Sequence, residues 1–179
     1  NLYSFWISSV TKTYISAWRI QLKLLRVSKL SFLSLKNDMI FYTLFQISFL
    51  IFIYLNYGLI ITIYSLFMSV VSFLFLETIN YVEHYGLLRK INSNGRYERV
   101  KPHHSWNSNH TIGRITLYEL TRHSDHHFKS SKKYQVLESI EDSPQLPYGY
   151  PTSILISFFP PLWFKIMNPL VEHHMGYSK

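Results

Sequence analysis

The stretch MIFYTLFQISFLIFIYLNYGLIITIYSLFMSVVSFLFL, residues 39–76, contains no Asp, Glu, Lys or Arg and lies between Asp38 and Glu77. A helix that crosses a bilayer needs about 20 apolar residues, so this stretch is long enough for two crossings. A buried helical pair in a soluble core is the alternative. Charge-free apolar runs of this length are more typical of membrane spans.

The middle of this stretch contains turn-forming residues. Asn56, Tyr57 and Gly58 lie where the two predicted spans, residues 39–57 and 59–77, meet, and Gly allows the backbone to reverse. The sequence therefore predicts two transmembrane helices that form a hairpin within residues 39–79.

Basic residues on both sides of the apolar stretch indicate its orientation. By the positive-inside rule, flanks rich in Lys and Arg stay in the cytoplasm. Both flanks are therefore predicted to be cytoplasmic, with only the tip of the hairpin on the far side. The basic residues are Lys12, Arg19, Lys23, Arg26, Lys29 and Lys36 before the stretch, and Arg89, Lys90, Arg96, Arg99 and Lys101 after it.

The composition agrees with a membrane protein. The 179-residue chain is 47% hydrophobic and only 16% charged, and 18 Lys and Arg against 10 Asp and Glu give it a formal net charge of +8. Because topology explains much of this positive charge, no nucleic-acid partner is predicted. The chain has no Cys, which excludes disulfides, cysteine nucleophiles and iron–sulfur clusters ligated by the chain itself.

We therefore predict an all-α integral membrane protein with three parts. Residues 1–38 are an amphipathic segment, in which residues 8–30 form a helix that lies in the headgroup region or packs on the protein. Residues 39–79 are the two spans. Residues 80–179 are a His-rich region with a helix at 113–129. An apolar segment at 154–167 is broken by Pro160-Pro161 and is too short to span.

Three histidines crowd together in RHSDHH. His123, His126 and His127 are spaced by three and four residues, which places them on one face of a helix. Neutral imidazole binds iron, zinc or copper through one ring nitrogen. A solvated basic face is the alternative, but this spacing beside further histidines favours a metal site.

A fourth histidine, His84, follows the second predicted span by about two helical turns. Ionisable groups this close to the membrane are functional candidates. Glu83 beside it is a candidate for orienting a ligand, and a structural pair between Glu83 and Arg89 is the alternative.

Several polar residues near these histidines are suited to orienting metal ligands by hydrogen bonds. With no Cys and few carboxylates nearby, a redox metal such as iron suits the histidines better than structural zinc. Besides Glu83, the candidates for this orienting role are Asp125, Glu119, His110, Asn107 and Asn109.

Four stretches together carry a resemblance to a known family: ETINYVEHYGLLR, GRYERVKPHHSWNSNH, RHSDHH and PQLPYGYP. In this order, they closely resemble motifs of the membrane-bound alkane 1-monooxygenases. These enzymes are non-haem diiron proteins related to the integral-membrane fatty acid desaturases and the xylene monooxygenases. The resemblance covers most of residues 77–170 and is looser in the N-terminal third.

In that family nine histidines hold two irons, and the resemblance assigns four of the ligand positions to His84, His123, His126 and His127. The two upstream histidine boxes of the family are absent, and no histidine precedes His84. The chain therefore resembles the C-terminal part of such an enzyme and is expected to be inactive by itself.

The resemblance also implies a reaction and a redox partner. It implies hydroxylation of the terminal carbon of medium-chain alkanes with O2, at the cytoplasmic side of a bacterial inner membrane. Rubredoxin would supply electrons, and Lys129, Lys132 and Lys133 are its candidate docking residues, with headgroup contact as the alternative. A desaturase or xylene-type hydroxylase of the same superfamily, or a non-catalytic membrane fragment, are the competing functions.

Overall fold

The computed structural model describes residues 1–176, and this part is helical, without strands. It divides into two compact units, one formed by residues 3–77 and the other by residues 1–2 together with residue 78 onward. The helices are α1 (Leu2–Val27), α2 (Asp38–His84), η1 (Pro102–His104), α3 (Thr111–Thr116), α4 (His123–Phe128), η2 (Tyr134–Val136), α5 (Tyr150–Ser157) and α6 (Pro160–Met175).

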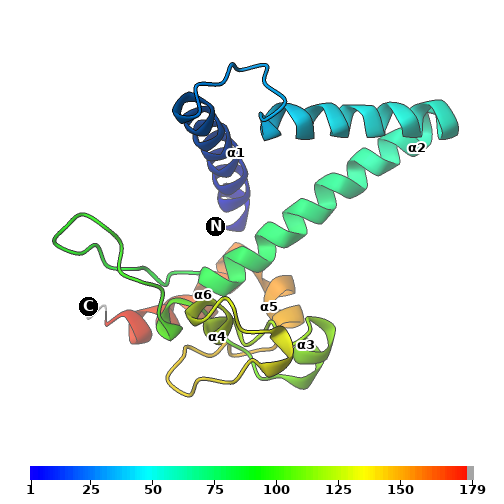
Figure 1. Cartoon of the computed structure of the whole chain (residues 1–179). Coiled ribbons are helices and arrows are strands. Elements are labelled where there is room, and N and C mark those ends of the chain that lie inside the picture. The colour runs from blue at the N-terminus through cyan, green and yellow to red at the C-terminus, as the bar shows by residue number, and fades with distance from the viewer. Residues whose placement is uncertain (177–179) are drawn as a thin grey trace. The chain divides into compact units, whose positions relative to one another are not determined.

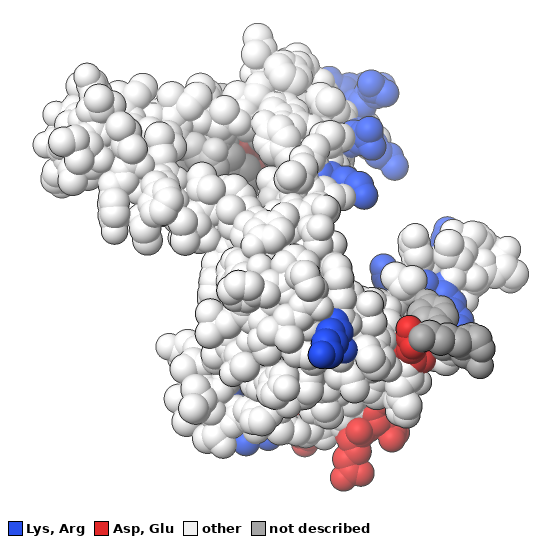
Figure 2. Space-filling model, turned by 180° about the vertical axis from the view of Figure 1, so that it is seen from behind, with Lys and Arg blue, Asp and Glu red and all other residues white. Residues whose placement is uncertain are grey.

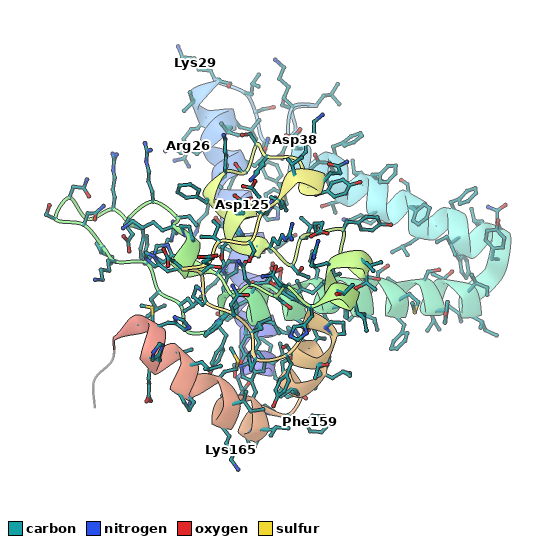
Figure 3. The ribbon with its side chains drawn as sticks, turned by 90° about the horizontal axis from the view of Figure 1, so that it is seen from below. Arg26, Lys29, Asp38, Asp125, Phe159 and Lys165 are labelled. Carbon is teal, nitrogen blue, oxygen red and sulfur yellow. The ribbon has the colours of Figure 1, made fainter. Side chains whose placement is uncertain are left out.

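The helix predicted at residues 8–30 is present, but it begins and ends earlier, because α1 runs from Leu2 to Val27. It ends where Lys29 takes a left-handed conformation with φ 53°, and the Leu30 amide then donates to the Leu25 carbonyl. The turn that follows is held by the Gln21 side chain, which donates to the Lys36 carbonyl at 2.8 Å. Arg26 and Lys29 extend from this end of α1 (Figure 3).

Helix α2 contains the whole apolar stretch, and its bend is tighter than the predicted turn (Figure 1). The side chain of Asn56 donates to the Phe52 carbonyl one turn back, as in a continuing helix. Only Gly58 leaves the helical conformation, with φ 78° and ψ 178°, a region open chiefly to Gly. The predicted three-residue turn is therefore a single residue, and a membrane-crossing hairpin stays a prediction.

The apolar side chains of α2 are exposed. Among the described residues, α2 is the one helix long and apolar enough to cross a membrane, and no residue of its most apolar window is buried. In Figure 2 this helix forms a uniformly white arm, whereas Lys and Arg gather near the end of α1 and the turn after it. An exposed apolar surface of this extent is suited to lipid or to other apolar helices.

The prediction of a single helix at residues 113–129 is wrong, because the structure has two short helices there. Helix α3 ends at Thr116 and α4 begins at His123, because Tyr118 and Glu119 have left-handed conformations with φ of 50° and 63°. The Glu119 carboxylate accepts two hydrogen bonds from the Arg114 guanidinium, both at 2.8 Å, and so stabilises the reversal. Periodicity does not reveal such a local ion pair.

The predicted break at Pro160-Pro161 is confirmed. The two prolines occupy the first turn of α6, where a missing amide proton costs no helical hydrogen bond. Helix α6 contributes Trp163 and Met167 to the core of the second unit, each 1% exposed.

Trp106 is the centre of that core. Its side chain is fully buried, its backbone amide donates to the Glu83 carbonyl at 2.8 Å, and its indole Nε1 donates to the Tyr85 carbonyl at 2.8 Å. The Tyr150 hydroxyl of α5 donates to the Trp106 carbonyl at 2.9 Å. Trp106 therefore connects the end of α2 to α5.

Gly86, just after α2, provides a test of this packing. Its φ of 72° is left-handed, and an added Cβ would lie 2.6 Å from Val171 Cγ2 of α6. Gly95 has nearly the same φ, 73°, but open space around it. Gly95→Ala is expected to lower the free energy of unfolding by about 1–2 kcal/mol from backbone strain alone. Gly86→Ala should lower it by about 1–3 kcal/mol more, because overpacking is added to strain.

Thermal unfolding of both variants in detergent, followed by circular dichroism, measures the difference. Equal losses for the two variants would show that Val171 does not pack against Gly86 as described.

Candidate metal centre

His84 is the last residue of α2, and a backbone carbonyl of another segment holds its ring. The His84 Nδ1 atom lies 3.3 Å from the carbonyl oxygen of His104. A carbonyl only accepts hydrogen bonds, so Nδ1 carries the proton and Nε2 keeps a free lone pair. This is the tautomer that a metal ligand requires at Nε2.

Helix α4 supplies the other three histidines. It is a short helix, and Asn107 compensates for its missing N-terminal hydrogen bonds. The Ser124 amide donates to Asn107 Oδ1 at 2.8 Å, and the Ser124 hydroxyl donates to the Ser105 carbonyl at 3.0 Å. All of these groups are buried. The position of α4 is therefore set by the segment that contains Ser105 and Asn107.

This segment, residues 104–108, also contacts the end of α2. His104 accepts from His84, and Trp106 donates to the carbonyls of Glu83 and Tyr85. The Ser108 amide donates to the Thr121 carbonyl at 3.0 Å, just before α4. One short segment thus joins two parts of the chain that are about 40 residues apart in sequence.

The structure brings His84, His123 and His127 together. One possible ligand nitrogen from each lies within 4.8 Å of the others. The Nε2 atoms of His84 and His123 are 3.3 Å apart, and the ring centroids of His123 and His127 are 4.2 Å apart. His123 is buried and the other two are partly buried. Three convergent imidazoles of this kind could hold a divalent metal ion.

His126, the remaining member of RHSDHH, lies beside this group and not within it. Its ring centroid is 5.9 Å from that of His123 and 5.6 Å from that of His127. The structure thus brings together three of the four predicted ligands and leaves His126 at their edge.

Glu83 reaches the same cluster from α2. Its Oε2 atom lies 3.2 Å from His123 Nε2, the nitrogen that also faces His84. Glu83 is 6% exposed, and no ion pair with Arg89 is present among the described residues. Burial raises the pKa of Glu83 to about 8, so without a metal this side chain is mostly neutral at pH 7. Once deprotonated, it would add an oxygen donor to the imidazoles, a combination typical of non-haem iron sites.

Burial keeps the α4 imidazoles neutral. Burial, together with the neighbouring His127, His84 and His126, lowers the pKa of His123 to about 2. Burial and the neighbouring histidines also lower the pKa of His127 to about 4. Because only neutral imidazole binds a metal, both side chains are ready to bind at physiological pH.

Two acidic residues that were predicted to orient histidines have other partners in the structure. Asp125 Oδ2 accepts from Lys132 Nζ at 2.7 Å and from the Glu138 amide at 2.8 Å, so it holds the loop after α4 (Figure 3). Glu119 pairs with Arg114 and lies 3.4 Å from Arg122 Nε. Both stabilise the backbone around α4 and contact no histidine among the described interactions.

The other predicted orienting residues differ in their surroundings. Asn107 is buried and donates to Ser143 Oγ at 2.6 Å, besides accepting from Ser124. Asn109 is exposed and donates to Ser139 Oγ. His110 is exposed at the start of α3.

Sequence reasoning did not assign a role to His104 or to Trp106. The contact of His104 with His84 uses a backbone carbonyl, which no motif reveals. The one available signal was that two histidines and a tryptophan occur together in KPHHSWN.

Comparison with known proteins gives consistent matches. The model of the fatty acid desaturase family matches residues 1–157. An alkane 1-monooxygenase 2 of Pseudomonas aeruginosa is 43% identical over 96% of this chain and 46% of its own length. An alkane 1-monooxygenase 2 of Alcanivorax borkumensis is 42% identical over 96% of this chain and 45% of its own length.

A more distant relative is the hydroxylase component of another monooxygenase. The xylene/toluene monooxygenase hydroxylase component XylM of Pseudomonas putida is 33% identical over 51% of this chain and 23% of its own length. The chain spans about half the length of the curated alkane 1-monooxygenases it matches.

Asn107 and Asn109 form a matched pair for testing how α4 is positioned. Asn107→Ala leaves the buried Ser124 amide and Ser143 hydroxyl without their partner. It should lower the free energy of unfolding by about 1–3 kcal/mol and weaken metal binding. Asn109→Ala removes an exposed hydrogen bond and should change stability by less than about 0.5 kcal/mol. Thermal unfolding and titration with Co²⁺ measure both effects, and equal behaviour of the two variants would contradict this role of Asn107.

Proposed function

The chain belongs to the fatty acid desaturase family, and we propose that it forms the C-terminal part of an enzyme that hydroxylates the terminal carbon of medium-chain alkanes with O2 at a non-haem diiron centre. The observation that carries this proposal is the convergence of His84, His123 and His127 at the end of an apolar helix. The alkane 1-monooxygenases that are 42–43% identical over 96% of the chain support it.

The metal-binding residues of this chain are proposed to be His84, His123, His126 and His127, with further ligands from the rest of the enzyme. Neutral imidazoles suit iron, and Glu83 would add an oxygen donor once deprotonated. When bound, the irons would activate O2, so that one oxygen atom enters the product and the other leaves as water.

A cavity of about 420 Å³ lies beside the cluster and suits an apolar substrate. His84, His104 and His127 line one part of it, and the remaining lining residues are mostly apolar: Leu87, Leu88, Arg89, Tyr97 and Val100. We propose that these residues receive the alkyl chain and exclude water, so that a C–H bond lies next to the metal ligands.

The apolar helix supports a centre that lies at a membrane. We propose that residues 39–79 cross a bacterial inner membrane twice, bending at Gly58, with residues 1–38 at the cytoplasmic surface and residue 80 onward forming the catalytic region. An alkane dissolved in the bilayer would then reach the cluster along the apolar surface of α2.

Electrons are proposed to come from rubredoxin. Lys129 and Lys133 are exposed after α4 and are free to attract an acidic partner. Lys132 is bound within the protein, 2.7 Å from Asp125 Oδ2 and 3.0 Å from Glu138 Oε2. The docking surface therefore consists of Lys129 and Lys133, and Lys132 supports the loop between them.

A xylene-type hydroxylase is the second candidate, supported by the match to XylM. That match covers 51% of the chain against 96% for the alkane 1-monooxygenases, so alkanes are the preferred substrate class. A desaturase of the same superfamily is the remaining alternative, and none of the relatives described above has that name.

Iron content and octane hydroxylation by the complete gene product test the proposal. His123→Ala is expected to lose bound iron and at least 100-fold in 1-octanol formation, because a buried ligand is removed. His173→Ala is the control, because His173 is exposed at the end of α6 and outside the cluster. Full iron content and full activity in the His123→Ala protein would refute the proposed centre.

The rubredoxin proposal has its own test. The double variant Lys129→Ala/Lys133→Ala is expected to raise the KM for rubredoxin several-fold and to weaken its dependence on salt, with the kcat at saturating rubredoxin little changed. Lys132→Ala should instead lower the unfolding temperature, because Asp125 and Glu138 both lose the ammonium group that they share. An unchanged KM for rubredoxin in the double variant would place the docking surface elsewhere.

A further inference from the structure

A second group of possible metal ligands lies between α2 and α3. One ligand atom each from Glu98, His103 and His104 lies within 4.8 Å of the others. His104 is 5% exposed, whereas His103 lies at the surface. By residue type alone this group resembles a second metal site.

The hydrogen bonds of His104 argue against a metal there. The Lys101 backbone amide donates to His104 Nδ1 at 3.0 Å, so Nδ1 carries no proton and its lone pair is occupied. In the neutral ring the proton is then on Nε2, which lies 3.3 Å from Glu98 Oε1. This contact lacks hydrogen-bond geometry, and the buried Nε2 has no hydrogen-bond partner among the described residues, so the attraction between Glu98 and this N–H is electrostatic. Neither ring nitrogen has a lone pair free for a metal.

Glu98 is itself held in place. Its Oε1 accepts from the Lys90 amide at 3.0 Å, and its Oε2 lies 2.9 Å from Lys101 Nζ. The Glu98 amide donates to the Lys90 carbonyl at 2.9 Å, and Ile91 and Tyr97 form an antiparallel bridge beside it. Glu98 is therefore presented by a hairpin-like loop that has its own backbone hydrogen bonds.

The other side of His104 faces the proposed metal centre. Its carbonyl oxygen is 3.3 Å from His84 Nδ1, and His84 Nε2 is 3.3 Å from His123 Nε2. The direction of this carbonyl depends on η1, and η1 is held by the contacts of the His104 ring and by the bond from the His104 amide to the Lys101 carbonyl. A continuous series of contacts thus leads from Glu98 through His104 to His84.

We propose that Glu98 and His104 form a clamp that positions the metal ligand His84. Glu98 holds the His104 ring, and His104 presents its carbonyl to the His84 Nδ1 proton. Nε2 of His84 is thereby kept unprotonated and directed toward His123. This inference rests on the proposed metal centre, and it makes Glu98 and His104 positioning residues that bind no metal themselves.

The test uses Co²⁺ as a visible probe, bound to the complete gene product in detergent, with affinity measured by competition with a chelator. Glu98→Ala and His104→Ala are expected to weaken Co²⁺ binding about 10- to 100-fold and to change its d–d absorption spectrum, without loss of binding stoichiometry. His104→Gln keeps an N–H donor near the position of Nε2 and should recover most of the affinity and the spectrum.

A neighbouring substitution is the matched control. His103→Ala removes the exposed histidine of the group and leaves the contacts of Glu98 and His104 in place. It should leave the Co²⁺ spectrum and affinity within about twofold of the wild type. Circular dichroism and the unfolding temperature show that each variant is folded, and Glu98→Gln replaces Glu98→Ala if the latter unfolds.

The outcomes separate this inference from the proposed function. If the wild type binds Co²⁺, His123→Ala abolishes this binding and the clamp variants behave like the wild type, the clamp is wrong and the metal centre stands. If His103→Ala lowers the number of bound Co²⁺ ions, Glu98, His103 and His104 form a metal site and the clamp is also wrong. If the wild type binds no Co²⁺ that depends on His123, both proposals fail.

Discussion

The end of helix α2 is the constraint on which the rest of the second unit depends. A helix leaves its last carbonyls without intrahelical partners, and here the helix ends inside the protein. Trp106 donates to two of these carbonyls, those of Glu83 and Tyr85, and the Leu87 amide lies 3.3 Å from the carbonyl of His84. Because Trp106 is fully buried and also accepts from Tyr150, the same contacts that terminate α2 define the core. His84 and Glu83 are thus fixed by the need to satisfy a helix end.

Two opposite environments meet at this point. Upstream, α2 exposes apolar side chains, which suit lipid. Downstream, the second unit buries polar groups, among them Glu83, Asn107, His123 and Asp125. Buried polar groups are costly unless they have partners. Asn107 pairs with Ser124 and Ser143, Asp125 with Lys132 and the Glu138 amide, and Glu83 with His123. At the proposed metal centre, the His84 ring and the start of α4 are held by hydrogen bonds of the segment 104–108.

Predictions from the sequence succeeded where one strong local pattern was sufficient. The charge-free stretch predicted the helical apolar segment, and Pro160-Pro161 predicted the break before α6. Predictions from the sequence failed where a local pattern competed with ion pairs and backbone conformations that the pattern does not show. Residues 113–129 have helical periodicity, yet the Arg114–Glu119 ion pair and the left-handed Tyr118 and Glu119 divide them into two short helices. Asp125 was expected to orient a histidine and binds Lys132 instead, because the loop after α4 folds back to it.

The sequence by itself determined the helical class, the apolar segment, the family resemblance and the residue types of the centre, because these depend on composition, periodicity and motifs. Only the tertiary structure decided which histidines meet. His84 and His123 are 39 positions apart. Their approach depends on backbone groups of residues 104–108 together with the side chains of Trp106 and Asn107, and no local pattern shows which partners these groups find. The tautomer of His84 and the role of Glu98 were likewise decided by the direction of a carbonyl. A sequence does not encode such directions locally, because they result from the packing of the whole unit.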